Sequence, residues 1–434
     1  MPTHSVYPYS AQTGTSAPAS LPASSSRIAP PGGPEFGLTD PPQGASQGAS
    51  LGIYAKSRAA LDFKGDFSGA SVDPETGEIS LPQDPAAVRL ERFALQSVAR
   101  SILPKARTAK CLRVPFARSV GVFHSQAQES AHYGGLVTCA SVWACPICAA
   151  KISERRRREL QHAMALCEAQ GGSVALLTLT HGHSLGDRLG DLLAAEQKAL
   201  HAFFSFRAGK RLMSAVGRVG HVRAWEITHG RLRDRNNGWH PHFHILLFLE
   251  TKHGDLSGAE EWGYAIWLNA CQLAGLPLPD RRHGITIQDG ANAAAYVAKF
   301  GQEAPKSWGL DAEMTKGHIK RARDGETPWD FLRSCLLQDD PQARRLFREY
   351  AECFKGKRQL VWSRGLRELL GLEDLSDEDL ASRQEEDAYL LANLSLEQWR
   401  IIRASDRRGE VLEVARHGDP QALNRYLDAI TSRP

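Results

Sequence analysis

The segment Trp239–Leu249 limits what this chain can fold into more than any other stretch. Read as a β-strand, whose side chains alternate between two faces, it places His240, His242 and His244 on one face and only apolar residues between them on the other. Neutral imidazoles bind divalent metals, and a strand fixes the distance between alternate side chains. The pattern therefore predicts a strand with one core face and one histidine face that can hold a metal ion. Histidines that pair with neighbours or face water are the alternative.

Length and composition favour a cytoplasmic globular protein. The chain has 434 residues, enough for two or three domains with a substantial buried core. No apolar run is long enough to span a membrane, and the first residues lack the charged and apolar regions of a signal peptide. Eight cysteines, several of them clustered, suit metal binding in a reducing compartment better than a disulfide framework.

Charge is unevenly distributed along the chain. The formal net charge is +4, but residues 366–434 hold nine Lys/Arg against fifteen Asp/Glu, so the rest of the chain carries a net charge of +10. Lys and Arg side chains that displace counterions from phosphates supply the salt-sensitive part of nucleic-acid affinity. A basic body therefore fits a polyanionic partner, although charge alone does not decide it.

The two ends of the chain differ from its middle. Residues 1–50 are rich in Ser, Ala, Pro and Gly and carry almost no charge, so we expect them to be disordered. Residues 51–104 are predicted to form a lead-in segment, with helical periodicity over 85–101. Residues 366–434 are predicted to form an acidic helical tail.

A cysteine cluster follows the lead-in segment. Cys145 and Cys148 are separated by two residues, a spacing that lets two thiolates reach one tetrahedral zinc, and Cys139 is a natural third ligand. A closed site of this kind would be structural. The alternatives are small buried thiols or a redox pair. The candidates for the fourth ligand are, in order of preference, Cys111 and then His132 or His124.

An arginine-rich helix is predicted directly after the cluster, over 149–170. It contains Lys151 and the consecutive arginines 155–158, which wrap around the helix so that at least one must face the protein or a ligand. A solvated charged face is the usual explanation of such a run. The neighbouring zinc knuckle favours contact with DNA phosphates instead. The knuckle and this helix together are predicted to occupy residues 105–170.

The elements after residue 171 predict an α+β fold. Their order, β-α-β-β-α-β-α, describes an antiparallel sheet with helices on one side, a split β-α-β arrangement. The predicted strands span 173–180, 221–229, 239–249 and 284–288, and the predicted helices span 189–216, 258–274 and 291–300.

One carboxylate can join the histidines. In the strand that precedes them, Glu226 is the only acidic residue on the face that can reach across the hairpin. Two imidazoles and a carboxylate make a three-ligand site with open positions, as needed for a metal that polarises a phosphate. A salt-bridged Glu226 is the alternative.

A tyrosine and a lysine lie on the last predicted helix. Tyr296 and Lys299 are three positions apart, so a phenol and an ammonium project from the same helix face. Beside a metal and a polarised phosphate, such a phenol can act as a nucleophile. Core packing of Tyr296 on this alanine-rich helix is the alternative.

Three segments together resemble a known family. Residues 176–180, 242–247 and 296–299 are similar, in that order, to the three motifs of the rolling-circle replication initiators of small plasmids, the type 1 (Rep) branch of the HUH endonucleases. The Cys-Pro-x-Cys segment with its arginine-rich helix is also similar to that branch. The resemblance covers roughly residues 105–365, with the nickase domain expected over 171–365.

The resemblance implies a metal-dependent endonuclease that nicks single-stranded or cruciform DNA at a plasmid origin, joins its tyrosine to the 5′ phosphate and frees a 3′ hydroxyl. Mg²⁺ or Mn²⁺ would be the catalytic ion and Zn²⁺ the structural one, with a host helicase or polymerase as candidate protein partners. A transposase, a mobilisation relaxase and a non-catalytic zinc DNA-binding protein are the alternatives. The implied metal ligands are His242, His244 and Glu226, with Tyr296 as nucleophile and Lys299 beside it on the phosphate.

One position departs from the family pattern. A carboxylate one helical turn before the tyrosine is expected to activate the water that ends a replication round, but this chain has Asn292 there, which is no general base at neutral pH. Asp289, two turns before Tyr296, is the first substitute, and a helix N-cap is its alternative role. Glu303 is the second substitute.

Overall fold

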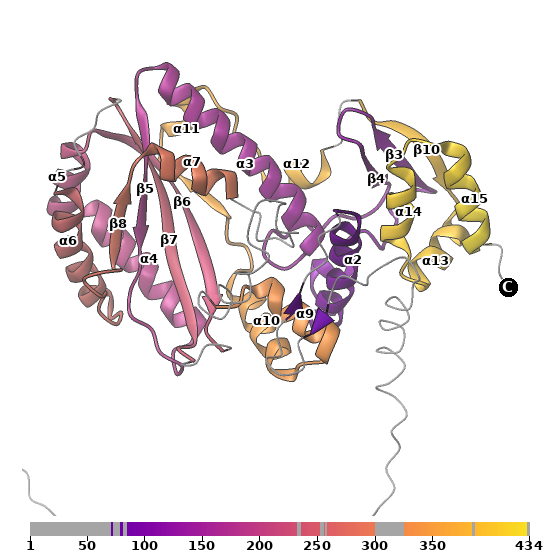
Figure 1. Cartoon of the computed structure of the whole chain (residues 1–434), viewed down its shortest axis with the longest axis horizontal. Coiled ribbons are helices and arrows are strands. Elements are labelled where there is room, and N and C mark those ends of the chain that lie inside the picture. Colours follow the sequence, from indigo (N-terminus) through magenta and orange to yellow (C-terminus); the bar gives the residue numbers. More distant parts are fainter. Residues whose placement is uncertain are drawn as a thin grey trace, which may run out of the picture. The chain divides into compact units, whose positions relative to one another are not determined.

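A five-stranded antiparallel sheet carries the histidine strand at its centre (Figure 1). The strand order is β8-β5-β7-β6-β9, and β6 and β7 pair along their whole length as the predicted hairpin. The four strands predicted for this sheet are therefore present, in the predicted order along the chain and with the predicted hairpin. The strands are β5 (Ser173–Leu179), β6 (Arg218–His229), β7 (Trp239–Leu249), β8 (Ile285–Gln288) and β9 (Leu360–Trp362).

This computed structural model describes residues 71–72, 79–80, 85–231, 236–251, 256, 258–299, 325–383 and 387–431. The segment predicted to be disordered, 1–50, and Glu303 lie outside these ranges. Within them, β1 (Ser71–Val72) pairs with β2 (Ile79–Ser80). No helix among the described residues has the length and apolar character needed to cross a membrane.

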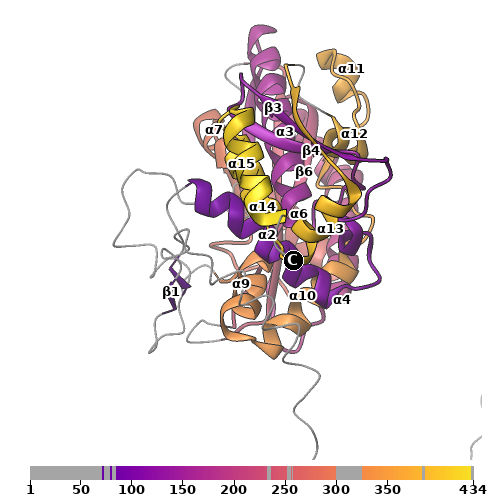
Figure 2. The same ribbon diagram turned by 90° about the vertical axis from the view of Figure 1, so that its right-hand side faces the viewer.

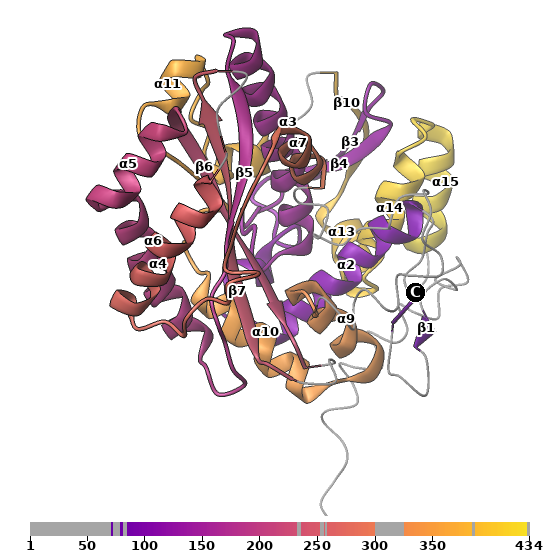
Figure 3. The same cartoon turned by 60° about the vertical axis from the view of Figure 1, so that its left-hand side comes forward.

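One face of the sheet is covered by α4 (Leu189–Ser205), α5 (Arg207–Ala215) and α6 (Ala259–Ala274) (Figures 1 and 3). The sequence predicts a single helix over 189–216, and that prediction is wrong: the chain is extended at Phe206, where α4 ends and α5 begins. Gly209 permits the break, because a Cβ at that position would overlap the carbonyl oxygen of Phe203. The helix is thus interrupted at Phe206, and α5 approaches the end of α4 so closely that only glycine fits at position 209.

The opposite face is also covered by helices, so the expectation of helices on one side is wrong. Here α3 (Pro146–Ala169), α7 (Gly290–Lys299) and α11 (Leu366–Leu370) pack on the sheet (Figure 3). The reason lies in β7 itself, whose histidine face becomes apolar at Leu246 and Phe248, both almost completely buried. A strand that is apolar on both faces must be covered on both.

A second sheet joins segments from opposite ends of the chain. Its order is β10-β3-β4, with β3 (Val120–Ser125) between β4 (Ser130–Gly134) and β10 (Tyr389–Leu394). Helices are present beyond residue 366, as the sequence predicts, but strand β10 is not foreseen. The helices that share its core are α13 (Leu396–Ala404), α14 (Arg408–Ala415) and α15 (Pro420–Thr431) (Figure 2).

Helix α2 (Pro85–Ile102) connects the two regions through ion pairs. Glu91 accepts two hydrogen bonds from the buried Arg333 of α9 (Pro328–Gln338), at 2.8 and 3.1 Å. On its other side, Arg89 binds Glu413 of α14 in a bidentate pair at 2.8 Å. Among the described residues, the remaining helices are α10 (Pro341–Cys353) and α12 (Asp377–Ser382), with a 3-10 turn at Arg107–Lys110.

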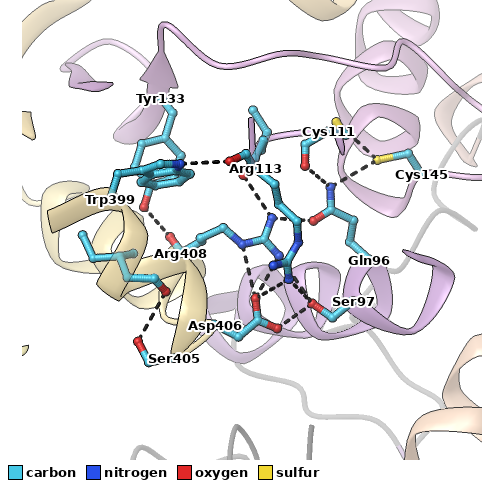
Figure 4. A network of polar contacts seen from close by, with 12 residues as sticks. Gln96, Ser97, Cys111, Arg113, Tyr133, Cys145, Trp399, Ser405, Asp406 and Arg408 are labelled. Atoms are coloured by element: carbon cyan, nitrogen blue, oxygen red, sulfur yellow. Dashed lines mark hydrogen bonds and ion pairs between the residues drawn. The ribbon is translucent and has the colours of Figure 1, made fainter. Parts of the chain in front are cut away.

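A buried guanidinium holds α2, the cysteine region and α14 together (Figure 4). Arg408 is fully buried, and its Nη1 donates to Oε1 of Gln96 at 2.6 Å and to the carbonyl oxygen of Leu112 at 3.2 Å. Oδ1 of Asp406 accepts from Nη2 of both Arg408, at 3.0 Å, and Arg113, at 2.7 Å. One carboxylate is therefore the shared counter-charge of two buried cations.

We expect Asp406→Asn to lower the free energy of unfolding by about 3 kcal/mol, because it leaves two buried guanidiniums without their shared counter-charge. Asparagine tolerates the left-handed backbone at this position, where φ is 55°, so the substitution tests charge alone. Urea denaturation followed by tryptophan fluorescence would measure the loss.

Asp374→Asn is the matched control, because Asp374 faces Arg367 at 3.6 Å but its side chain is 67% exposed. An exposed pair of this kind contributes less than about 1 kcal/mol. Equal losses in the two variants would contradict the central role of Asp406.

Candidate functional site

Three predicted ligands meet in the middle of the sheet. Glu226 of β6 lies directly opposite His242 of β7 in the strand register. Its Oε2 is 2.7 Å from Nε2 of His244 and 3.5 Å from Nε2 of His242, and the two Nε2 atoms are 3.2 Å apart. The alternation of β7 and its pairing with β6 thus bring all three groups to one point. We call these three residues the triad.

The spacing of the triad fits a divalent ion. Neighbouring ligands at right angles around an ion with bonds of about 2.1 Å lie about 3.0 Å apart, close to the three distances found here. The side chains of His242, His244 and Glu226 are 10, 15 and 28% exposed, so the group is approachable from one side. Three ligands with an accessible side leave room for a substrate oxygen.

The electrostatics also favour a cation. Burial disfavours the charged form of Glu226, but the adjacent imidazoles of His242 and His244 outweigh burial and hold the pKa of this carboxyl well below its usual value. Glu226 is therefore ionised at neutral pH and gives the triad one negatively charged ligand.

Tyr296 lies beside the triad. Its ring centroid is 4.7 Å from that of His244, with 37° between the ring planes. Helix α7 positions this side chain, because Ala293, one turn before Tyr296, and Val297, directly after it, are buried against the sheet. Tyr296 is half-buried where α7 meets the sheet. The predicted nucleophile therefore lies next to the predicted metal ligands.

The other two predicted catalytic residues flank Tyr296 in sequence. Asp289 stands at the start of α7, where its Oδ1 accepts hydrogen bonds from the backbone N–H and the side-chain amide of Asn292, at 3.2 and 3.1 Å. This is the geometry of an N-cap. Lys299 is the last residue of α7, and its side chain lies outside the described part of the structure.

The third histidine of the strand lies outside the triad. The ring of His240 stacks on that of His242, with centroids 4.9 Å apart, and on that of His183, with centroids 4.5 Å apart. His183 follows β5 and was not foreseen, because histidines in a loop carry no strand or helix periodicity. Thr178 lies in the first of the three family-like segments, 176–180, and its hydroxyl oxygen is 3.1 Å from Nδ1 of His244.

The four predicted cysteines form one buried cluster. The cluster consists of Cys111, Cys139, Cys145 and Cys148. Its fourth member is thus Cys111, the preferred candidate for the fourth ligand. The Sγ atoms of Cys111 and Cys148 are 3.5 Å apart, those of Cys139 and Cys148 3.6 Å, and those of Cys145 and Cys111 3.8 Å. Four thiolates at 2.3 Å around a tetrahedral zinc would lie about 3.8 Å apart.

The polar surroundings of the cysteine cluster are fixed by the Arg408 network (Figure 4). Nε2 of Gln96 donates to the carbonyl oxygen of Cys111 at 2.8 Å and contacts Sγ of Cys145 at 3.9 Å. Hydrogen bonds among the thiols hold the pKa of Cys139 far below its usual value and raise that of Cys111. Burial raises the pKa of Cys145. Without a cation, four buried sulfurs cannot all ionise, so the cluster suits a metal.

The arginine run contacts the chain itself. Arg155 donates to the carbonyl oxygens of Leu380 and Arg383, and Arg156 binds the carboxylates of Glu159 and Asp377. Arg157 and Arg158 both pair with Glu154, and Lys151 donates to the carbonyl oxygens of Ala381 and Arg383. The segment around α12 therefore accounts for Lys151, Arg155 and Arg156, whereas Arg157 and Arg158 pair within α3 itself.

Comparison with known proteins gives the family. A model described as replication protein matches residues 136–407, more than half of the chain. The chain is 28% identical over 313 residues to "Protein rep" of Streptomyces lividans, which covers 57% of this chain and 67% of that protein. It is 29% identical over 162 residues to "Neomycin resistance protein" of Streptomyces cyanogenus, which covers 31% of this chain and 36% of that protein. No solved structure matches.

The match includes every element of the central sheet and all residues of the triad, together with Tyr296 and three of the four cysteines. The chain belongs to the replication protein family, which confirms the resemblance to plasmid replication initiators that its motifs indicate.

Proposed function

We propose that this initiator is a site-specific, metal-dependent endonuclease that nicks single-stranded or cruciform DNA at a plasmid origin. The observation that supports this most strongly is the position of Tyr296 against His244, at one edge of the triad. A phenol held beside a metal-binding group can attack a phosphate that the same group binds. Core packing alone would not require a tyrosine to adjoin three potential ligands.

His242, His244 and Glu226 would hold Mg²⁺ or Mn²⁺, and an ion bound there polarises the scissile phosphate. The Oη atom of Tyr296 attacks the phosphorus, and the bond from phosphorus to the 3′ oxygen breaks. The phenolic proton is lost and the departing 3′ oxygen gains one, so the products are a 5′-phosphotyrosyl link and a free 3′ hydroxyl. That hydroxyl is the primer end that rolling-circle replication needs.

The cysteine cluster would hold Zn²⁺ as a structural ion. Its four sulfurs are buried and leave no open coordination position. It connects α2 and α3 at the point where the Arg408 network also meets them. Loss of the ion would therefore disturb several elements at once.

The main alternative is a zinc protein that binds DNA without cutting it. The sequence argument for that alternative is weakened, because two residues of the arginine run, Arg155 and Arg156, bind the chain around α12. A transposase or mobilisation relaxase would share the chemistry of Tyr296 and differ in the DNA that it recognises. A covalent link between protein and DNA separates the cutting enzymes from the binding protein.

Tyr296→Phe is expected to abolish cleavage and the covalent adduct, because it removes only the attacking oxygen. DNA affinity should change by less than about threefold, ~0.7 kcal/mol. The assay incubates full-length protein with labelled single-stranded origin DNA and Mn²⁺, then resolves the products on a denaturing gel.

Tyr264→Phe is the matched control, because the hydroxyl of Tyr264 donates to the carbonyl oxygen of Pro279 on the other side of the sheet. It should cut like the parent. Adduct formation by Tyr296→Phe at the parent rate would refute the assignment of the nucleophile.

Cys145→Ser is expected to remove the bound zinc and lower the free energy of unfolding by at least ~3 kcal/mol, because binding of structural zinc contributes ~10 kcal/mol or more to folding. Metal analysis of the purified protein and a thermal melt would measure both effects. Cys353→Ser, a substitution outside the cluster, should retain the metal and the melting temperature. An unchanged melt and zinc content in Cys145→Ser would contradict a structural zinc site.

Asp289→Asn is expected to leave the first nick intact and slow the release of the tyrosyl adduct, if Asp289 activates the terminating water. Asparagine caps helices about as well as aspartate, so the start of α7 should be preserved. Single-turnover measurements would follow adduct formation and decay separately. Equal decay in parent and variant would leave Asp289 with its capping role alone.

A further inference from the structure

A threonine on the neighbouring strand β5 contacts one residue of the triad, His244. Thr178 of β5 lies directly opposite His244 of β7 in the strand register, and its Oγ1 is 3.1 Å from Nδ1 of His244. The other ring nitrogen, Nε2, points into the triad, toward Oε2 of Glu226 and Nε2 of His242. The two nitrogens of this imidazole therefore face two different partners.

The two nitrogens of a neutral imidazole have opposite roles. One carries the proton and donates, and the other has the lone pair that binds a metal. The group that accepts a hydrogen bond from one nitrogen thus determines which nitrogen is free for the ion. In metal sites this second group also fixes the ring orientation, and its removal typically costs 10- to 100-fold in metal affinity.

We propose that Thr178 is a positioning residue for His244: its hydroxyl accepts a hydrogen bond from Nδ1–H, so that the Nε2 lone pair faces the ion. The proposal rests on the proposed function, in which the triad holds the divalent ion. It adds a residue whose own atoms do not touch the ion or the DNA phosphate.

The fold makes Thr178 a rigid partner. β5 pairs with β7 on one side and with β8 on the other, where Thr178 lies opposite Thr286. A strand with paired backbone on both sides cannot shift to follow a moving imidazole. Threonine is also branched at Cβ, which restricts χ1 and keeps the hydroxyl directed at the ring.

A nearby threonine shows that the contact is specific. Thr180, two residues further along the chain, directs its hydroxyl to the carbonyl oxygen of His283, at 2.6 Å. The hydroxyl of Thr180 thus binds a backbone carbonyl just before β8, whereas the hydroxyl of Thr178 contacts a side chain of the triad. Replacing threonine by valine at each position therefore distinguishes two effects. At position 180 only a hydroxyl bound to the backbone is lost, whereas at position 178 the contact with His244 is lost.

The test measures Mn²⁺ affinity of the full-length, zinc-loaded protein in the absence of DNA, by the electron paramagnetic resonance of free Mn²⁺. We expect Thr178→Val, which keeps the shape and removes the hydroxyl, to weaken binding by about 10- to 100-fold. Thr178→Ser should restore most of the affinity, and Thr180→Val should bind within about twofold of the parent. Glu226→Gln removes the carboxylate of the triad, so the Mn²⁺ binding that is lost in this variant is the binding that belongs to the triad.

A second measurement uses the parent protein, so it does not require any variant to fold. In protein labelled with ¹⁵N histidine and loaded with Mg²⁺, the nitrogen shifts of His244 should place the proton on Nδ1. A proton on Nε2 in that state, or parent-like Mn²⁺ affinity in Thr178→Val, would overturn the proposal for Thr178 and leave the triad assignment standing. A parent protein that binds no Mn²⁺ at the triad would overturn the proposed function, and this inference with it.

Discussion

The pairing of β7 on both of its edges is the constraint on which the site depends. Backbone hydrogen bonds to β6 and β5 set the register, and the register alone puts Glu226 and Thr178 beside the histidines. A shift by one residue would turn the histidines to the fully apolar face, and Trp239 and Phe243 to the face that the histidines now occupy. The core beneath Phe243 and Phe248 prevents that shift, since both side chains are completely buried on opposite faces of the sheet. Hydrophobic burial thereby fixes the geometry of a polar centre.

The second set of constraints is ionic and lies between the two sheets. Arg408, Arg333 and Arg156 are all buried, and each is held by carboxylates or carbonyl oxygens from distant parts of the sequence. Buried charges need such partners, because an isolated charge in a protein interior is very costly. Arg156 and Arg333 belong to the basic part of the chain that suggested a polyanionic ligand, and at these positions they bind the chain's own acids and backbone.

Much of the central sheet could be predicted because its signals are local. The alternation of β7, the hairpin to β6 and the Cys-x2-Cys spacing are all readable within short windows, and each led to residues that the structure brings together. Features that depend on distant partners were missed. The break at Phe206 requires the approach of Gly209 to Phe203, and strand β10 requires an edge supplied by β3. The second helical layer could have been inferred from Leu246 and Phe248, whose apolar side chains continue the histidine face.

The pairing of β10 with β3 has a consequence for how the protein is made. Leu390 pairs with Phe123, so the partner strand is synthesised only after 267 further residues. At roughly 5–20 residues per second, the edge of β3 waits about 13–53 s on the ribosome for its neighbour. During that time an unpaired strand edge is available to other chains. The central sheet, whose strands lie closer in sequence, can form first, and the smaller sheet can close only after residues 389–394 have been synthesised.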